Sequence, residues 1–222
     1  MPGSEVVSSL SRRQLKALRQ PGPGAAVPDA ARGGMRTPRS HAVVGPLRSL
    51  EHLELRQVRV ASLDGLEQAA GLSTLRINFA PRLRSIAAVR RLGALEDLSL
   101  DSCKRIEGIE CIGDATGLQY LSLSCLPVPD PSFIGRLGRM KALCLWSVGR
   151  IPSLAFLAGL RELGSCQLVE NVVVEDGDMA VLLGLPALTL VVYTERRHYR
   201  PRLEEIRAAL DERKRARREL RA

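Results

Sequence analysis

The sequence predicts an α/β solenoid, in which short coils stack on one another and each contributes one strand to a parallel β-sheet. Three observations support this fold class. Pairs of the form Leu-x-Leu recur about every 22 residues, further apolar residues follow each pair at spacings of two or three, and the spacing becomes helical after Tyr193. We therefore expect a sheet on one face, short helical or 3-10 arcs on the opposite face, and a C-terminal capping helix.

Each Leu-x-Leu pair predicts a β-strand, because side chains alternate between the two faces of a strand and both leucines then point into the core. The first leucine of each pair serves as the anchor of its repeat. Leu163 is counted as the sixth anchor, although Ser165 stands where the second leucine of its pair would be. Successive anchors then lie 20 to 25 residues apart. The predicted strands cover residues 53–56, 75–78, 98–101, 121–124, 143–146, 163–166 and 188–192.

The segments between the predicted strands keep an apolar inner edge. In one of them, Ile86, Val89 and Leu92 follow one another at steps of three residues. This spacing favours a short helical or 3-10 arc that lies across the core from the strands. We expect six or seven such coils over residues 41–195, which form a single solenoid domain.

The repeat resembles the 22-residue, internalin-like class of the leucine-rich repeat family, and the resemblance covers residues 41–195. It implies a sheet on the concave face, arcs on the convex face and a concave surface that binds a protein; bacterial relatives act as scaffolds, regulators or immunity proteins. The family has asparagine after each strand, where backbone groups need a partner. Other residues stand there in this chain, so we expect irregular coils whose backbone groups find water or other backbone. These residues are Val58, Ala80, Cys103, Leu126, Val148, Leu168 and Tyr193.

Both ends of the chain are basic, whereas the repeat body is nearly neutral. Residues 1–40 hold 7 Lys and Arg against 2 Asp and Glu, and residues 195–222 hold 11 against 6. Residues 21–46 contain five prolines and five glycines, so we expect residues 1–40 to form a mobile arm and linker. Over residues 196–222, Leu203, Ile206 and Leu210 recur at helical spacing. They predict a helix over 202–219 whose first half caps the solenoid, while its second half is solvated or partner-bound.

Several functional classes are disfavoured by the sequence. No run approaches the roughly 20 apolar residues of a membrane-spanning helix, and the five cysteines form no Cys-x-x-Cys pair, which favours a reduced cytoplasmic protein. No phosphate-binding loop or zinc-site spacing occurs. The histidines do not share a strand row with a serine or cysteine nucleophile, apart from His52, which lies four coils from Cys144. We therefore expect no catalytic residues, cofactor or metal.

The residues between and after the inward leucines are expected to line the concave surface. One predicted row is Glu54, Arg76, Ser99, Ser122, Cys144, Gly164 and Thr189, and its neighbour is Arg56, Asn78, Asp101, Ser124, Trp146, Cys166 and Val191. His52, Asp97, Tyr120 and Glu162 are expected at the rim.

Trp146, the only tryptophan in the chain, is the centre of the predicted contact. The repeat predicts that it is exposed, and Trp, Tyr and Arg dominate binding energy at protein interfaces. Packing of the indole across Cys144, Cys166 or the last coil is the structural alternative. The candidate partner-binding residues are Arg56, Arg76, Asn78, Asp101, Tyr120, Ser122, Ser124, Trp146 and Glu162.

The sequence therefore predicts a monomeric, non-enzymatic module that binds a protein partner through its concave face. The alternative is a protein that binds nucleic acid or an anionic surface through its basic termini, with the solenoid as a spacer. Salt separates the two, since binding to phosphates weakens steeply as salt is added.

Overall fold

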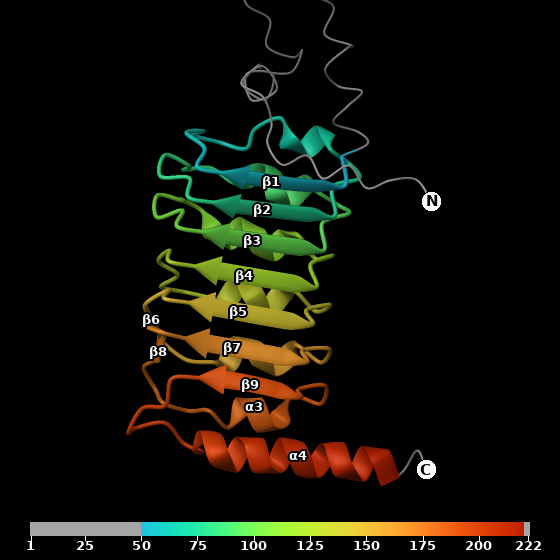
Figure 1. The fold of residues 1–222 in the computed structure, drawn as a ribbon, viewed down its shortest axis with the longest axis vertical. Helices are drawn as coiled ribbons and strands as arrows, with labels where there is room; N and C mark the ends of the chain where they lie inside the picture. The colour runs from blue at the N-terminus through green and yellow to red at the C-terminus, as the bar shows by residue number, and fades with distance from the viewer. Residues whose placement is uncertain (1–49, 220–222) are drawn as a thin grey trace, which may run out of the picture.

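The computed structural model describes residues 50–219, and these form one solenoid with a seven-stranded parallel sheet (Figure 1). Each strand pairs in register with the strand of the next coil, so that Leu98 lies between Leu75 and Leu121. The predicted fold class is confirmed. The strands of this sheet, in order, are β1 (His52–Arg56), β2 (Thr74–Asn78), β3 (Asp97–Asp101), β4 (Tyr120–Ser124), β5 (Ala142–Trp146), β7 (Ser165–Val169) and β9 (Leu190–Tyr193). The expected N-terminal arm and the first residues of the expected solenoid lie outside the described residues.

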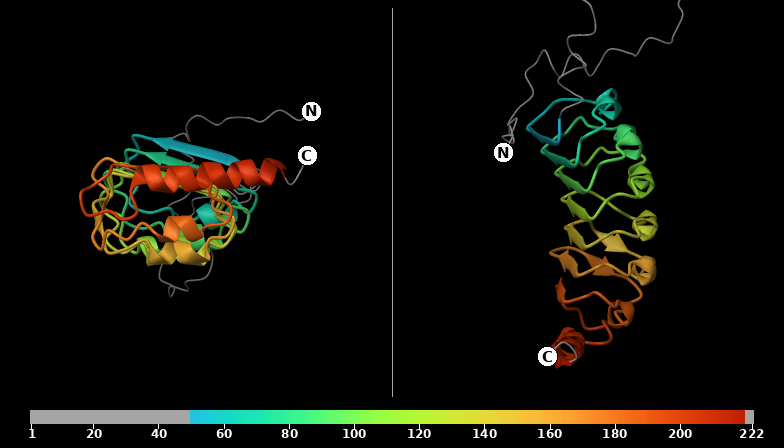
Figure 2. Two further views of the ribbon diagram at one scale, coloured as in Figure 1. Left: turned by 90° about the horizontal axis from the view of Figure 1, so that it is seen from below. Right: turned by 90° about the vertical axis from the view of Figure 1, so that its right-hand side faces the viewer.

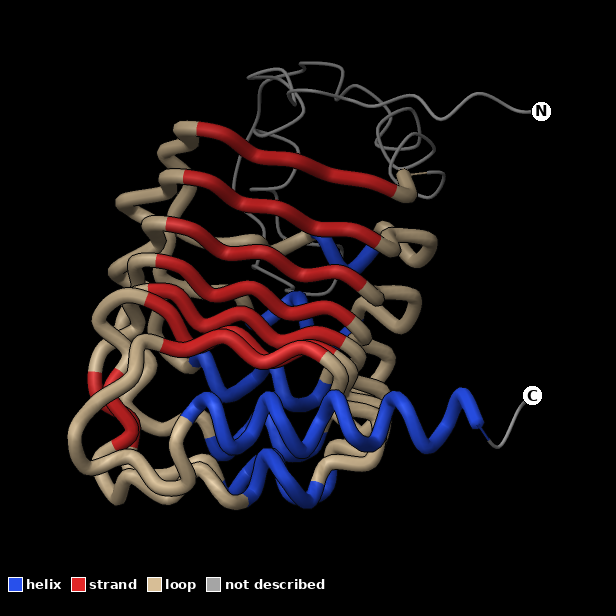
Figure 3. The backbone as a smooth tube through the Cα atoms, turned by 60° about the horizontal axis from the view of Figure 1, so that its bottom comes forward, coloured by secondary structure: helices blue, strands red, loops and turns tan. Residues whose placement is uncertain are grey.

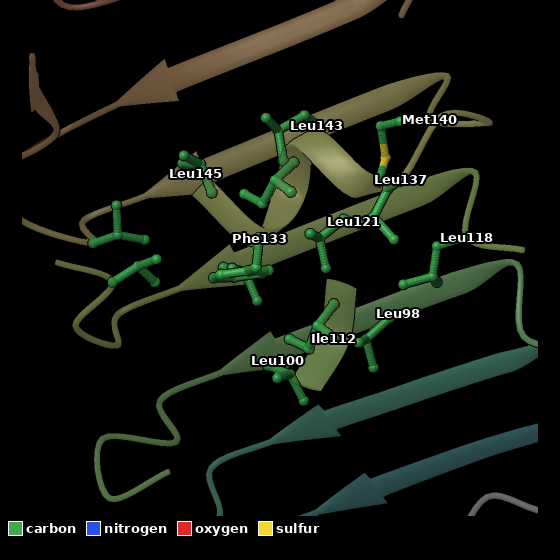
Figure 4. Close-up of a cluster of buried hydrophobic side chains, with 14 of the residues drawn as sticks. Leu98, Leu100, Ile112, Leu118, Leu121, Phe133, Leu137, Met140, Leu143 and Leu145 are labelled. Carbon is green, nitrogen blue, oxygen red and sulfur yellow. The ribbon is translucent and has the colours of Figure 1, made fainter. Parts of the chain in front are cut away.

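Short arcs form the second layer, on the side opposite the sheet (Figure 2). Five are 3-10 helices and one is a single α-helical turn, as the three-residue apolar spacing predicts. They are η1 (Leu66–Gln68), η2 (Ala87–Arg91), η3 (Ile109–Asp114), η4 (Ser132–Arg136), η5 (Ala155–Gly159) and α3 (Val181–Gly184). The space between arcs and strands is filled by apolar side chains, including Ile112 and Phe133 from the arcs and Leu121 from the sheet (Figure 4).

The last two strands of the sheet begin later than the sequence predicts. β7 places Cys166 beside Leu143 and Leu168 beside Leu145, so the inward pair is Cys166 and Leu168 and the strand lies three residues past the predicted anchor, Leu163. In β9 the inward residues are likewise Val191 and Tyr193, both buried. The expected positions of Gly164, Thr189, Cys166 and Val191 on the concave face are therefore wrong. Leu163 and Leu188 are core leucines that precede their strands.

Each of the first six strands of the sheet is followed directly by a residue with left-handed backbone. The φ angles of these residues lie between 51° and 61°, although none is glycine. The N–H groups of the first five donate to the next coil; that of Gln57 reaches the Asn78 carbonyl at 2.8 Å and that of Phe79 reaches the Asp101 carbonyl at 2.9 Å. Backbone of the neighbouring coil thus supplies partners after the first five strands, as expected without an asparagine ladder. The left-handed residues are Gln57, Phe79, Ser102, Cys125, Ser147 and Glu170.

A second, two-stranded sheet lies in the loops that follow the main strands. It pairs β6 (Arg150–Ile151) with β8 (Val173–Val174) in parallel. The hydroxyl of buried Tyr199 accepts a hydrogen bond of 2.8 Å from the Val174 N–H. This small sheet therefore joins the last coils to the segment that leads into the C-terminal helix.

The C-terminal helix α4 (Leu203–Glu219) covers the open edge of the sheet beside β9 (Figure 1). Ile206 and Leu210 are buried against the core, which confirms that the first half caps the solenoid. The second half also takes part, because Arg213 donates to the carbonyl of Leu185 at 2.9 Å and to that of Leu183. Arg217 donates to the carbonyl of Pro186. Along residues 50–219, no helix combines the length and the apolar character that crossing a membrane requires.

Arg213→Ala should lower the free energy of unfolding by about 1–3 kcal/mol, because the carbonyls of Leu183 and Leu185 at the C-terminal end of α3 lose the hydrogen bonds from its guanidinium. The Leu185 carbonyl keeps only the long bond of 3.4 Å from the Leu188 N–H. Arg215→Ala is the matched control on the same helix, since Arg215 is exposed, and it should change stability by less than about 0.5 kcal/mol. Thermal melts followed by far-UV circular dichroism measure both. Equal melting temperatures for the two variants would show that Arg213 does not contribute to the cap.

Candidate binding surface on the concave face

The concave surface is built from the first, third and fifth residue of each strand of the main sheet, apart from β9, whose four residues supply only a first and a third. In β1, Leu53 and Leu55 are buried while His52 and Arg56 are exposed, and the same alternation holds along the sheet. Parallel pairing in register turns these positions into three continuous rows. Of the candidate partner-binding residues, Arg56, Arg76, Asn78, Asp101, Ser122, Ser124 and Trp146 lie on this face.

Charged side chains on the first strands neutralise one another. Arg56 Nε lies 2.6 Å from Glu54 Oε1, which also accepts a hydrogen bond of 3.1 Å from Asn78 Nδ2. The hydrogen bond from Arg56 lowers the pKa of Glu54 below its ordinary value. One coil further, Arg76 Nη2 lies 2.8 Å from Asp97 Oδ2. The two arginines expected to serve a partner are thus already held by carboxylates of the same face.

The concave face of β4, β5, β7 and β9 carries no charged residue, and we call it the uncharged face. Three large hydrophobic side chains are exposed on it: Tyr120 at 46%, Trp146 at 44% and Leu190 at 48%. A shallow hollow of about 130 Å³ lies beside Tyr120, where Asp97, Cys144 and Gln167 are among the other lining residues. The uncharged face comprises Tyr120, Ser122, Ser124, Ala142, Cys144, Trp146, Ser165, Gln167, Val169, Leu190 and Val192.

Two expected neighbours of Trp146 lie away from it. Tyr120 begins β4 and is paired with Ala142, whereas Trp146 ends β5, so the two residues lie four positions apart, or about 13 Å along the strand direction. Glu162 lies in the turn before β7, at the opposite end of the strands from Trp146. The expected single aromatic centre flanked by Glu162 is therefore wrong, and the exposed hydrophobic residues are spread across the face.

Sequence reasoning missed five residues of the uncharged face that belong to β7 and β9, because the predicted register of these two strands is wrong. They are Ser165, Gln167, Val169, Leu190 and Val192. A constant repeat length is the sequence signal that places these residues correctly. If Cys166 is taken as the sixth anchor, the step from Leu143 is 23 residues, equal to the step between Leu75 and Leu98.

The thiols near this surface are poor nucleophiles. Burial raises the pKa of Cys144, although a hydrogen bond with Ser122 opposes this shift, and burial raises the pKa of Cys166 to about 12. Both are therefore protonated at neutral pH, and a protonated thiol reacts slowly. Within residues 50–219, no three His, Cys, Asp or Glu side chains gather where they could hold a metal ion.

A larger hollow, of about 570 Å³, lies away from the concave face, beside β8. Arg150, Glu175 and His198 are among its lining residues. Arg150 Nε lies 2.7 Å from Glu175 Oε1, and His198 Nε2 lies 3.0 Å from the carbonyl of Val174. These groups already have partners in the chain, whereas the buried Nε of Arg196, which also lines the hollow, has no hydrogen-bond partner within residues 50–219.

Comparisons with known proteins relate the chain to others through its structure. No protein-family model and no curated protein sequence matches it. An internalin from Listeria monocytogenes has 23% sequence identity and a TM-score of 0.55, and the match covers 68% of this chain and 49% of the internalin. The leucine-rich repeat domain of the type III effector XopL has 19% identity and a TM-score of 0.52, with 82% of this chain and 65% of that domain covered.

A leucine-rich repeat protein from Leptospira interrogans has 19% identity and a TM-score of 0.50, and the match covers 72% of this chain and 40% of that protein. The chain therefore spans about half the length of the solved proteins that it matches. Sequence identities of this size show that these proteins share a fold with the chain, and nothing more.

Proposed function

We propose that this leucine-rich repeat solenoid binds a folded protein partner through the uncharged face and carries out no reaction of its own. The observation that carries the proposal is the exposure of Tyr120, Trp146 and Leu190 on a sheet face without charge. Monomeric proteins seldom expose several large hydrophobic side chains on one surface unless it makes contacts. The partner contact is therefore centred on β4 to β9 rather than on the arginines of β1 and β2.

The chemistry of the uncharged face suits a protein surface. Burial of Trp146 and Leu190 against a partner removes apolar area from water, which favours association. Ser122 and Ser124 provide hydroxyls that donate or accept hydrogen bonds, and their transfer from water costs less than that of charged groups. The face therefore combines apolar anchors with small polar groups, as protein interfaces do.

Trp146→Ala should weaken binding of the partner by about 30-fold or more, equivalent to about 2 kcal/mol, because truncation of a central tryptophan removes a binding hot spot. The partner is captured from a lysate of the native host with the wild-type protein, then purified and titrated calorimetrically. Phe79→Ala is the matched control, since Phe79 is an exposed aromatic residue that follows β2 and lies outside the uncharged face. Undiminished affinity of the Trp146 variant would refute the proposal.

We propose further that the protein acts as a monomeric scaffold, regulator or immunity-type protein in a reducing compartment such as the bacterial cytoplasm. All five cysteines are free thiols in the structure, and Cys103, Cys111 and Cys166 are buried. Nucleic-acid binding through the C-terminal helix is less favoured, because Arg213 and Arg217 donate to backbone carbonyls of the solenoid.

A further inference from the structure

Basic side chains gather at one end of the strands of the sheet, where the later strands begin. Lys141 directly precedes β5, Arg139 lies two residues before it, and Arg161 lies in the turn before β7. Arg215 and Arg218 lie in the last turns of α4. We call these five residues the basic edge.

Docking of α4 places its basic half at this edge. The helix runs antiparallel to the strands and its C-terminal end passes beyond the edge where the strands begin (Figures 1 and 3). Arg213 contacts Leu185 and Arg217 contacts Pro186, and these two partners precede β9. The basic edge therefore adjoins the part of the uncharged face where Leu190 is exposed.

The charge of the basic edge is not neutralised within the described chain. Over residues 50–219, no carboxylate lies within 4 Å of a cationic group of Arg139, Arg161, Arg215 or Arg218, in contrast to the paired arginines of β1 and β2. Glu162 and Glu219 reduce the excess of positive charge without balancing it.

The rest of the border of the sheet differs in charge from the basic edge. At the same end of the strands but in earlier coils, Glu51 and Glu96 precede β1 and β3. At the opposite end of the later strands, acidic and basic groups are interleaved and form pairs such as Arg150 with Glu175 and Arg202 with Glu195. A strong positive potential therefore borders the uncharged face along one side only.

We propose that the basic edge binds an acidic patch on the protein partner, beside the apolar surface that the uncharged face contacts; this inference rests on the proposed function. The partner is then an acidic protein that docks in one orientation, since a negative patch fits one side of the face. Opposite charges of this kind steer association and fix orientation more than they add affinity.

A protein fits this surface better than a nucleic acid. Single-stranded nucleic acid needs cations along its path and aromatic rings on which successive bases stack. Here Trp146 lies between Ser124 and Val169 in its row, with no cation among them, and much of the adjoining surface is aliphatic. Aliphatic contact next to a basic border instead matches a protein surface with an acidic rim.

A fluorescein-labelled octaglutamate peptide, followed by fluorescence anisotropy at about 20 mM salt, where screening is weak, tests the basic edge without the natural partner. Wild type should bind the peptide, and the quadruple variant R139E/R161E/R215E/R218E should bind it at least about tenfold more weakly. The control R59E/R82E/R90E/R91E has the same net charge, and its four exposed arginines lie away from the edge. It should keep wild-type affinity, and circular dichroism verifies that both variants are folded.

The inference is overturned if wild type does not bind octaglutamate, or if the two quadruple variants lose affinity equally. It is also overturned if labelled oligothymidylate of eight nucleotides binds more tightly than the peptide through the same four arginines, because the basic edge then recognises nucleic acid. The peptide does not require the indole, so Trp146→Ala should bind it normally. Failure of the proposed contact at Trp146 is thereby distinguished from failure of the basic edge.

Discussion

Replacement of Leu121 by aspartate should unfold the whole solenoid. Leu121 is 2% exposed in the central strand β4, where it lies between Leu98 and Leu143 in the core (Figure 4). The substitution removes a leucine, worth about 2–5 kcal/mol when truncated in a core, and places a carboxylate where no donor is available, which costs several kcal/mol more. Together these costs approach the roughly 5–15 kcal/mol that stabilises a typical domain.

The loss should spread beyond β4 because the coils of a solenoid stabilise one another only through their neighbours. An unfolded central coil leaves three strands of the sheet on each side, each group with a newly exposed apolar face. Ser122→Asp is the matched control, since Ser122 is the next residue on the same strand and faces outward. It should retain the wild-type melting transition within a few degrees.

Thermal denaturation and size-exclusion chromatography measure the outcome. Leu121→Asp should show no cooperative transition and an expanded or aggregated chain, whereas Ser122→Asp should behave as wild type. A cooperative melt retained by the Leu121 variant would contradict the assignment of this leucine to the core of a stacked coil.

The first five strands of the sheet could be predicted because their apolar pairs recur at steps of 22 or 23 residues. A period constrains every coil by its neighbours, so Leu53, Leu75, Leu98, Leu121 and Leu143 support one another. The exposure of Trp146 follows from the same register, since it stands one residue after the inward Leu145. Alternation along a strand thus predicts both the core and the centre of the candidate site.

The sixth and seventh strands could not be placed by leucines alone. The inward pair of β7 is Cys166 and Leu168, so cysteine replaces the first leucine and no Leu-x-Leu pair can be recognised there. Leu163, which precedes this pair, is the nearest leucine that could be taken for its anchor. Cysteine is often buried as a small apolar residue, and pairing of Cys166 with Leu143 in the sheet resolves the register. The residues of the uncharged face on β7 and β9 depend on that register.

Side-chain pairing and the docking of α4 are also beyond the repeat pattern. The contact between Arg76 and Asp97 joins two coils and depends on the rotamers of both side chains. The basic edge brings the last turns of α4 beside turns of earlier coils, and its position depends on the contacts of Arg213 and Arg217 with residues about 30 positions earlier. A net charge for the C-terminal segment does not reveal which border of the sheet receives it.

Gly113→Ala should destabilise the solenoid by about 1–3 kcal/mol through crowding on the convex side. Gly113 lies in η3, where a Cβ atom would stand 2.6 Å from the carbonyl oxygen of Phe133 and equally close to the guanidinium of Arg136 in η4. Arg136 is a flexible side chain that moves aside, but it then gives up its hydrogen bonds of 2.9 Å to Asp114 and 2.7 Å to the Glu110 carbonyl. The Phe133 carbonyl belongs to the backbone, so the arcs must separate.

The next coil repeats this close approach, because a Cβ atom on Gly135 would stand 2.9 Å from the carbonyl oxygen of Phe156. Gly138 is the matched control, since a Cβ atom there meets nothing within 4 Å and its φ is not in the left-handed region. Gly138→Ala should leave stability unchanged or raise it by up to about 1 kcal/mol, because alanine restricts the unfolded chain. Chemical denaturation of both variants measures the difference; equal stabilities would show that the spacing of η3 and η4 does not depend on the absence of a side chain at Gly113.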